Sequence, residues 1–234
     1  MRREASVGGI LGELFSLLGD SARDLALYTL VIGGIDAAGV LAGLTESADA
    51  TLNYGFMINS NDSPASALFE FVSSVVSIFG TYLLLARFLA VRGLLRGGRA
   101  RFWHYLGTAI LSTIGVVLGL FLLFVPGIML LVRWSAASGF VIGGGESVTG
   151  SLSASWEATR GHGWAIFFAA LLMLIGITAC AGVAAGIVGQ ASPVAAGSVS
   201  AFVEAASGGV LAAFGIAVYC LVNDDAQDIS EVFA

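Results

Sequence analysis

The apolar run from Tyr105 to Ile142 constrains the fold most, because Arg133 is the one charged residue in it. As a single helix it would be about 57 Å long at ~1.5 Å per residue, nearly twice the ~30 Å hydrocarbon core of a bilayer. Proline lacks an N–H and glycine tolerates unusual dihedral angles, so we expect the chain to turn at Pro126-Gly127. Lipid cannot satisfy free backbone groups, so we expect protein to cover this turn. The run therefore predicts two membrane spans, at about 105–125 and 128–142.

The composition extends this prediction to the whole chain. Hydrophobic residues make up 57% of the sequence and charged residues only 11%, whereas soluble domains are about a quarter charged. Four more apolar stretches predict spans at about 25–44, 67–91, 163–189 and 199–222. We therefore expect an all-α integral membrane protein with a single transmembrane domain over 1–234. Its roughly six transmembrane helices would form three hairpins, each preceded by an interfacial segment.

The arginines predict the orientation. Arginines occur near the N-terminus, in 92–101 and at Arg160, whereas the loops 45–66 and 190–198 contain none. By the positive-inside rule both termini face the cytoplasm. The amphipathic segment 6–20 predicts a helix that lies in the membrane interface or packs on the helix bundle, and the sequence leaves both open. The tail 223–234 is acidic.

A second amphipathic helix is expected at 147–160, on the cytoplasmic surface. Val148, Leu152, Trp156 and Thr159 recur at helical spacing, and the helix is expected to pack through Trp156. Glu146 stands where the helix dipole favours an anion, and Gly161 suits the C′ position. Helix formation alone explains this segment, so Ser155 is interpreted as a residue of the helix face and not as a nucleophile.

Ionisable residues inside the spans form a candidate buried charge network, which consists of Arg133, Glu204, Asp36 and Glu70. Arg133 follows the expected turn by about two helical turns, roughly 9 Å inside the membrane. An arginine at that depth needs a partner. We expect Glu204, at the same depth, with Asp36 as the alternative. The network would be a proton or cation path, a site for an anionic ligand, or a structural ion pair. Arg133 would otherwise extend its side chain to the outer headgroups.

The arginine-rich segment after the second span is the candidate site for lipid headgroups. Its members are Arg92, Arg96, Arg99 and Arg101. Such a cluster binds anionic headgroups or only sets the topology, and both interpretations stay open.

The residues give no catalytic, cofactor-binding or metal-binding pattern. No nucleophile elbow, phosphate loop or HExxH spacing occurs. The net charge of −6 and the absence of lysine exclude a polybasic nucleic-acid binder. Cys180 and Cys220 fall in different apolar stretches and are interpreted as packing residues.

The segment from Pro126 to Trp164 resembles the YciC-like family of bacterial inner-membrane proteins. It is similar as well to the membrane domain attached to some glycerophosphodiester phosphodiesterases. The positions that carry the resemblance, about a sixth of the chain, are Pro126, Gly127, Arg133, Trp134, Glu146, Ser155, Trp156, Thr159, Gly161 and Trp164. The resemblance implies a multi-pass protein of the bacterial inner (plasma) membrane and no defined activity.

Two functions follow as hypotheses. The first is a non-enzymatic membrane protein, without a cofactor, that binds lipid or a protein partner and contributes to membrane or envelope organisation. Its partners would be membrane lipids or a larger membrane protein complex. The alternative is a small transporter or channel-like protein that uses Arg133, Glu204 and Asp36.

Overall fold

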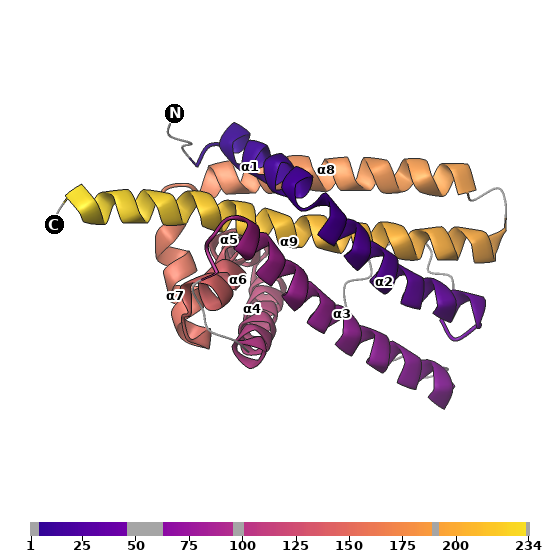
Figure 1. The fold of residues 1–234 in the computed structure, drawn as a ribbon. Helices are drawn as coiled ribbons and strands as arrows, with labels where there is room; N and C mark the ends of the chain where they lie inside the picture. The colour runs from indigo at the N-terminus through magenta and orange to yellow at the C-terminus, as the bar shows by residue number, and fades with distance from the viewer. Residues whose placement is uncertain (1–4, 46–62, 96–100, 189–191, 233–234) are drawn as a thin grey trace. The chain divides into compact units, whose positions relative to one another are not determined.

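The structure is a computed structural model that describes residues 5–45, 63–95, 101–188 and 192–232, with the backbone alone at Pro193 and 224–232. Every regular element in these residues is helical (Figure 1). In chain order they are α1 (Val7–Asp20), α2 (Ala22–Leu41), α3 (Pro64–Val91), α4 (Phe102–Leu122), α5 (Phe124–Arg133), α6 (Ala137–Gly139), the π-helix η1 (Phe140–Gly144), α7 (Val148–Ala158), α8 (Gly163–Val188) and α9 (Pro193–Val232).

Six helical stretches among the described residues are long and apolar enough to cross a membrane. They are Ala22–Leu41, Pro64–Val91, Phe102–Leu122, Phe124–Gly144, Gly163–Val188 and Val194–Asn223. This confirms the prediction of an all-α membrane protein with about six candidate spans. The arrangement as three hairpins with interfacial segments stays a prediction.

The chain divides into two compact units. The first contains residues 1–21, 85–173 and 211–234, and the second contains 22–84 and 174–210. The core of the first unit is the α9 segment Ala213–Val222, in which nine of ten residues are buried side chains and the tenth, Gly215, is also enclosed. Side chains from α1, the end of α3, η1 and the start of α8 complete this core; they include Ile10, Leu14, Leu17, Phe88, Leu89, Val141 and Ile166.

The second unit relies on small residues for close helix contact. A Cβ on Gly33 would lie 2.9 Å from the Cα of Phe202, so α2 and α9 approach each other nearly backbone to backbone. A Cβ on Gly80 would lie 3.1 Å from the side chain of Ile32, so this glycine of α3 makes room for a side chain of α2. The hydroxyls of Tyr28 and Thr81 share a hydrogen bond of 3.0 Å between the same two helices. Such contacts are typical of packing in membranes, where dispersion and interhelical hydrogen bonds drive association.

The turn between α4 and α5 lies at Leu123, and the prediction of a turn at Pro126-Gly127 was wrong by three residues. Leu123 is extended, with φ −155° and ψ 127°, and α5 begins at the next residue. Pro126 is the third residue of α5, where a missing N–H costs nothing because the first turn of a helix has no internal acceptor. Gly127 instead allows α4 and α5 to cross closely, since a Cβ on Gly119 would lie 3.0 Å from its Cα.

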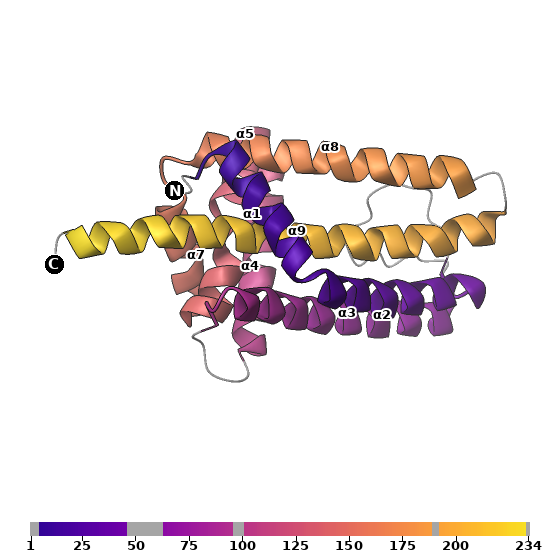
Figure 2. The same cartoon turned by 45° about the horizontal axis from the view of Figure 1, so that its top comes forward.

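The expected fourth span, 128–142, is not one helix. α5 ends at Arg133, the chain turns at Trp134–Ala136, and α6 and η1 follow. α5 packs along α4 in the opposite direction, because Gly119 lies against Gly127 and Gly115 against Trp134. Beyond the break, Gly139 lies against Tyr219 of α9, and Phe140 packs edge-on against the same ring at a centroid distance of 4.8 Å. Figures 1 and 2 show α4 running crosswise to the C-terminal part of α9, drawn in yellow.

α1 packs on the first unit by one face. Ser6 caps the helix by accepting a hydrogen bond of 3.1 Å from the N–H of Gly9. Ile10, Leu14 and Leu17 are at most 2% exposed, whereas Phe15 on the other side is 69% exposed. The structure therefore shows the packed helix, and the interfacial position stays a prediction.

Candidate functional site

The break between α5 and α6 frees the carbonyl oxygen of Arg133. In a continuous helix the N–H of Ala137 would donate to this oxygen. Here that N–H donates to the carbonyl of Trp134 at 3.1 Å instead. A carbonyl oxygen that loses its helical hydrogen bond in an apolar environment needs a hydrogen bond from another donor.

Two hydroxyls of α7 supply the missing donors. The Oγ of Ser155 donates to the Arg133 carbonyl at 2.7 Å. The Oγ1 of Thr159 reaches the same oxygen at 3.3 Å and also donates to the carbonyl of Ser155 at 2.8 Å. Both side chains have an exposed fraction of 0%. These contacts give Ser155 a structural role in joining α7 to the break.

The buried face of α7 is more polar than the sequence indicated. Ser151, Leu152, Ser155 and Thr159 are buried, whereas Val148 and Trp156 are only half-buried. The hydroxyl of Ser151 shares a hydrogen bond of 3.2 Å with that of Thr108 on α4. Thr108 and Ser151 were not recognised in the sequence. The i, i+4, i+8 spacing of Ser151, Ser155 and Thr159 was the available signal.

The side chain of Arg133 lies over the ring of Trp156, with the guanidinium carbon 5.4 Å from the ring centroid. This is a cation–π distance, and it pairs two of the positions that carry the family resemblance. The Nη1 atom of Arg133 is buried and has no hydrogen-bond partner in the described part of the chain. Arg133 therefore adds a side-chain contact to the same α5–α7 junction that its carbonyl forms.

The predicted acids lie in the second unit and Arg133 in the first. Asp36 on α2 accepts a hydrogen bond from the hydroxyl of Ser73 on α3. Glu204 on α9 is exposed. Glu70 on α3 is half-buried. The pairing of Arg133 with Glu204 or Asp36 stays a prediction.

Arg133 lies level with the start of α8 in the first unit. A Cβ on Gly163, the first residue of α8, would lie 4.0 Å from the side chain of the neighbouring Val132. The hydrogen bond from Thr159 places the end of α7 at the same level. The depth assigned from the sequence, about 9 Å inside one face, assumed a straight fourth span, and the break after Arg133 removes the basis for that assignment.

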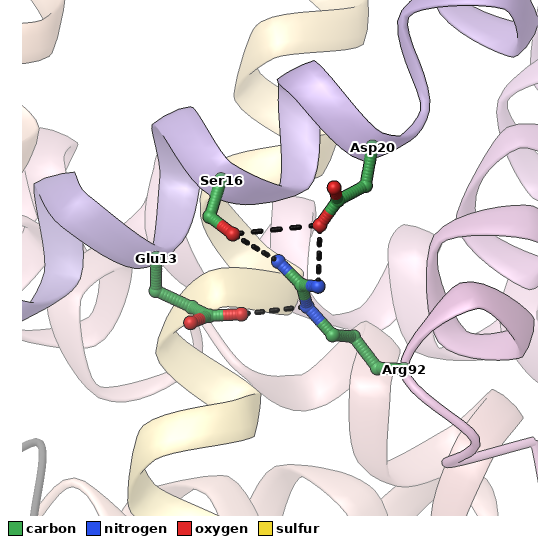
Figure 3. Close-up of polar contacts among 4 residues, drawn as sticks. All are labelled: Glu13, Ser16, Asp20 and Arg92. Atoms are coloured by element: carbon green, nitrogen blue, oxygen red, sulfur yellow. Dashed lines mark hydrogen bonds and ion pairs between the residues drawn. The ribbon is translucent and has the colours of Figure 1, made fainter.

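Arg92 binds α1 to the end of α3 (Figure 3). Its Nε lies 2.7 Å from the carboxylate of Glu13 and its Nη1 2.7 Å from that of Asp20, while Nη2 donates to Ser16 at 3.1 Å. Burial alone would lower the pKa of Arg92, but the hydrogen bond to Asp20 and the charges of Glu13 and Asp20 raise the pKa above its ordinary value. Arg92, a candidate contact for lipid headgroups, therefore forms ion pairs within the chain that join α1 to the end of α3.

Arg101, the second described member of the arginine cluster, has internal partners as well. Its Nη1 donates to the carbonyls of Glu146 at 2.7 Å and Val141 at 3.2 Å, next to the left-handed Gly145 with φ 80°. A cation at the carbonyl end of a helix is favoured by the helix dipole, and η1 ends here. Arg96 and Arg99 lie outside the described residues.

The remaining positions of the resemblance have local structural roles. Ser147, not Glu146, caps α7 by accepting from the N–H of Gly150 at 3.1 Å, and Glu146 precedes the cap. α7 ends at Ala158 with Thr159 as its C-cap, so Gly161, with φ 90°, is one residue beyond the expected C′ position. Trp164 is 75% exposed in the first turn of α8.

The comparisons with known proteins give no match: no family model, no curated protein and no solved structure is similar to this chain. The resemblance to the YciC-like family stays a prediction. Within the described residues, no group of three or more histidine, cysteine or acidic side chains is placed to hold a metal ion. The polar contacts of the first unit form a structural junction between α5 and α7, and the acids of the second unit form a candidate site within that unit.

Proposed function

We propose that this chain is a non-enzymatic protein of the bacterial inner membrane that binds lipid or a protein partner and contributes to membrane organisation. The observation that carries the proposal is the apolar surface that its helices leave uncovered. Only 11% of the apolar window of α8 is buried within the chain. Val183 and Ile187 on this helix are 63% and 74% exposed. Acyl chains or a partner helix would cover such a surface.

The polar residues of the first unit support a structural role over a catalytic one. Ser155 and Thr159 serve the released carbonyl of Arg133, and Arg92 and Arg101 bind groups of the same chain. We further propose that both termini face the cytoplasm, as the segregation of the arginines predicts. Arg96 and Arg99 are then the arginines of the cluster proposed for anionic headgroups.

Native mass spectrometry from nanodiscs tests this proposal. The protein would be released from discs of phosphatidylcholine that contain a minority of phosphatidylglycerol, and retained lipids would be weighed. We expect the Arg96→Gln/Arg99→Gln double variant to retain several-fold less phosphatidylglycerol than the natural protein. Arg160→Gln is the matched control, because Arg160 is an exposed arginine that pairs with Glu157 at 3.4 Å. Equal retention by all three proteins, with no copurifying protein, would contradict the proposal.

A transporter or channel-like function is the second candidate, and the acids of the second unit favour it. Asp36, Ser73 and Glu204 come from three different helices of this unit, and Asp36 accepts a hydrogen bond from Ser73. Acidic groups inside spans are expensive and often mark ion or proton pathways. In proteoliposomes loaded with a pH-sensitive dye, proton flux that Asp36→Asn and Glu204→Gln abolish would establish this function. Flux equal to that of empty liposomes would exclude proton transport.

A further inference from the structure

The tip of the α4–α5 hairpin, defined as Phe121–Val125, is an exposed and wholly apolar turn. Its five side chains are between 66% and 88% exposed. A turn that meets water normally carries polar residues or glycine. Exposure of five large apolar side chains to water would cost several kcal/mol at ~25 cal/mol per Å². The chemistry of the tip therefore requires an apolar environment.

The backbone of the tip is suited to hydrocarbon as well. The N–H of Leu123 donates to the carbonyl of Gly119 at 3.0 Å, and the N–H of Gly127 donates to the carbonyl of Leu123 at 3.3 Å. Pro126 has no N–H to satisfy. The first turn of a helix ordinarily presents four unpaired donors, and here the missing N–H of Pro126 and the bond from Leu123 to Gly119 remove two of them. Fewer unpaired donors lower the cost of burying the turn in lipid.

The tip is too close to the start of α8 to reach the far side of a bilayer. α5 has 10 residues, which span about 15 Å. Its penultimate residue, Val132, lies against Gly163, where α8 begins. α8 has 26 residues, or about 39 Å. The tip is thus no more than about 15 Å from the level at which α8 starts, half the ~30 Å thickness of the hydrocarbon.

The length of α4 points to a hairpin that lies along the membrane. α4 has 21 residues, about twice the length of α5, so an upright α4 would extend beyond the start of α8 into water. Yet Trp103 in its first turn is 74% exposed, and the part of α4 nearer the tip exposes further apolar side chains, including Ile110, Ile114, Val117 and Leu118. In Figure 2, α4 lies crosswise to the C-terminal part of α9. A crosswise hairpin keeps all of these side chains at a depth where acyl chains surround them.

We propose that the α4–α5 hairpin inserts into the one leaflet in which α8 begins and does not cross the membrane. Its tip and the exposed side of α4 then contact the acyl chains of that leaflet. The crossing helices are α2, α3, α8 and α9, so two of the six candidate spans lie in the membrane plane. Both termini stay on one side, as with six crossings. The inference goes beyond the proposed function and holds whichever ligand or partner the protein binds.

Distances between spin labels test the depth of the tip. In full-length protein with Cys180→Ala and Cys220→Ala, labels would be placed at Leu123→Cys with Trp164→Cys, and at Leu123→Cys with Ser192→Cys. The first pair measures the tip against the start of α8, and the second against the turn beyond its end. In nanodiscs we expect the second distance to exceed the first by more than about 10 Å, given a ~39 Å helix between the two reference sites. A tip nearer to Ser192 than to Trp164 would overturn the proposal.

The surroundings of the same label identify what covers the tip. Oxygen concentrates in acyl chains and a nickel chelate in water, so the label at Leu123 should relax with oxygen and not with nickel. Relaxation by nickel would place the tip in water, and relaxation by neither would mean that protein or a second copy covers it. Both results overturn the proposal. Val125→Cys, also at the exposed tip, repeats both measurements if Leu123→Cys does not fold.

Discussion

The Nε atom of Arg92 lies 2.7 Å from the carboxylate of Glu13, which has a side-chain exposure of 8%. This ion pair joins α1 to the end of α3 across 79 residues of sequence. Glu13 is a buried charged side chain of the described part of the first unit, and Arg92 forms an ion pair with it. The pair fixes the N-terminal helix on the rest of the unit.

Removal of Arg92 should destabilise the protein more than removal of the pair. Arg92→Ala removes the ion pair that the buried Glu13 carboxylate makes with this guanidinium, and we expect a loss on the order of 2–4 kcal/mol, near the range for broken buried pairs. Glu13→Gln/Arg92→Gln should cost less. Melting temperatures in detergent measure both, with Asp20→Asn as the control, since Asp20 is 51% exposed and should contribute at most ~1 kcal/mol. A double variant less stable than Arg92→Ala would refute this account.

The contribution of the Arg92 cation should not vary between about pH 6 and pH 10. The neighbouring carboxylates raise the pKa of Arg92 above its ordinary value, which already lies well beyond pH 10. A raised pKa gives stability that is complete below the unfolded pKa and is lost only as the pH rises through the folded pKa. The difference in melting temperature between the natural protein and Arg92→Ala should therefore stay constant over this range. A difference that declines toward pH 10 would show that the cation is not the stabilising group.

The two hydroxyls on the Arg133 carbonyl should substitute for each other. In Ser155→Ala, Thr159 still lies 3.3 Å from that oxygen and can donate to it. In Thr159→Val, Ser155 retains its bond of 2.7 Å. The double variant leaves the carbonyl unsatisfied, at about 1–3 kcal/mol. A double-mutant cycle should thus show a loss greater than the sum of the single losses, whereas Ser153→Ala on the exposed side of α7 should be neutral.

Gly127→Ala should weaken the α4–α5 crossing. A Cβ at this position would lie 2.5 Å from the backbone nitrogen of Leu120, so the two helices must separate. Overpacking of this kind typically costs about 1–3 kcal/mol. Gly176→Ala is the matched control, because a Cβ there meets nothing within 4 Å. Equal melting temperatures for the two variants would show that the crossing tolerates a methyl group.

The orientation is tested by cysteine labelling of intact cells. A membrane-impermeant maleimide added outside should label Asn59→Cys and should not label Gly98→Cys until the cells are opened. Asn59 falls in the predicted arginine-free outer loop, and Gly98 falls in the arginine-rich segment. Labelling of Gly98→Cys alone in intact cells would reverse the topology.

Local sequence patterns predicted where the helices lie. They did not predict the long-range contacts that accompany the break between α5 and α6. Apolar length was enough to place the candidate spans, and the spacing around Trp156 was enough to place α7. Pro126 was misleading, because proline fits the first turn of a helix as well as it fits a loop. The break after Arg133 has neither proline nor glycine, and it depends on hydroxyls of α7 more than 20 residues away in the sequence.

The buried polar partners were the least predictable part. Glu13 and Arg92 belong to different helices, and an amphipathic pattern assigns Glu13 only to a polar position. The salt bridge exists because α1 folds onto the end of α3, which no periodicity within α1 encodes. Gly119 and Gly115 are similar cases, since their role is visible only when Gly127 and Trp134 lie against them.

The break after Arg133 also affects the mechanics of the bilayer. With the hairpin in one leaflet as proposed, each copy of the protein enlarges the area of that leaflet while the opposite leaflet gains nothing from α4 and α5. A bilayer relieves unequal leaflet areas by bending, so amphipathic and wedge-like insertions depend on curvature. With that insertion, the short α5, 10 residues long, would make the protein a wedge whose preferred membrane is convex on the side where α8 begins.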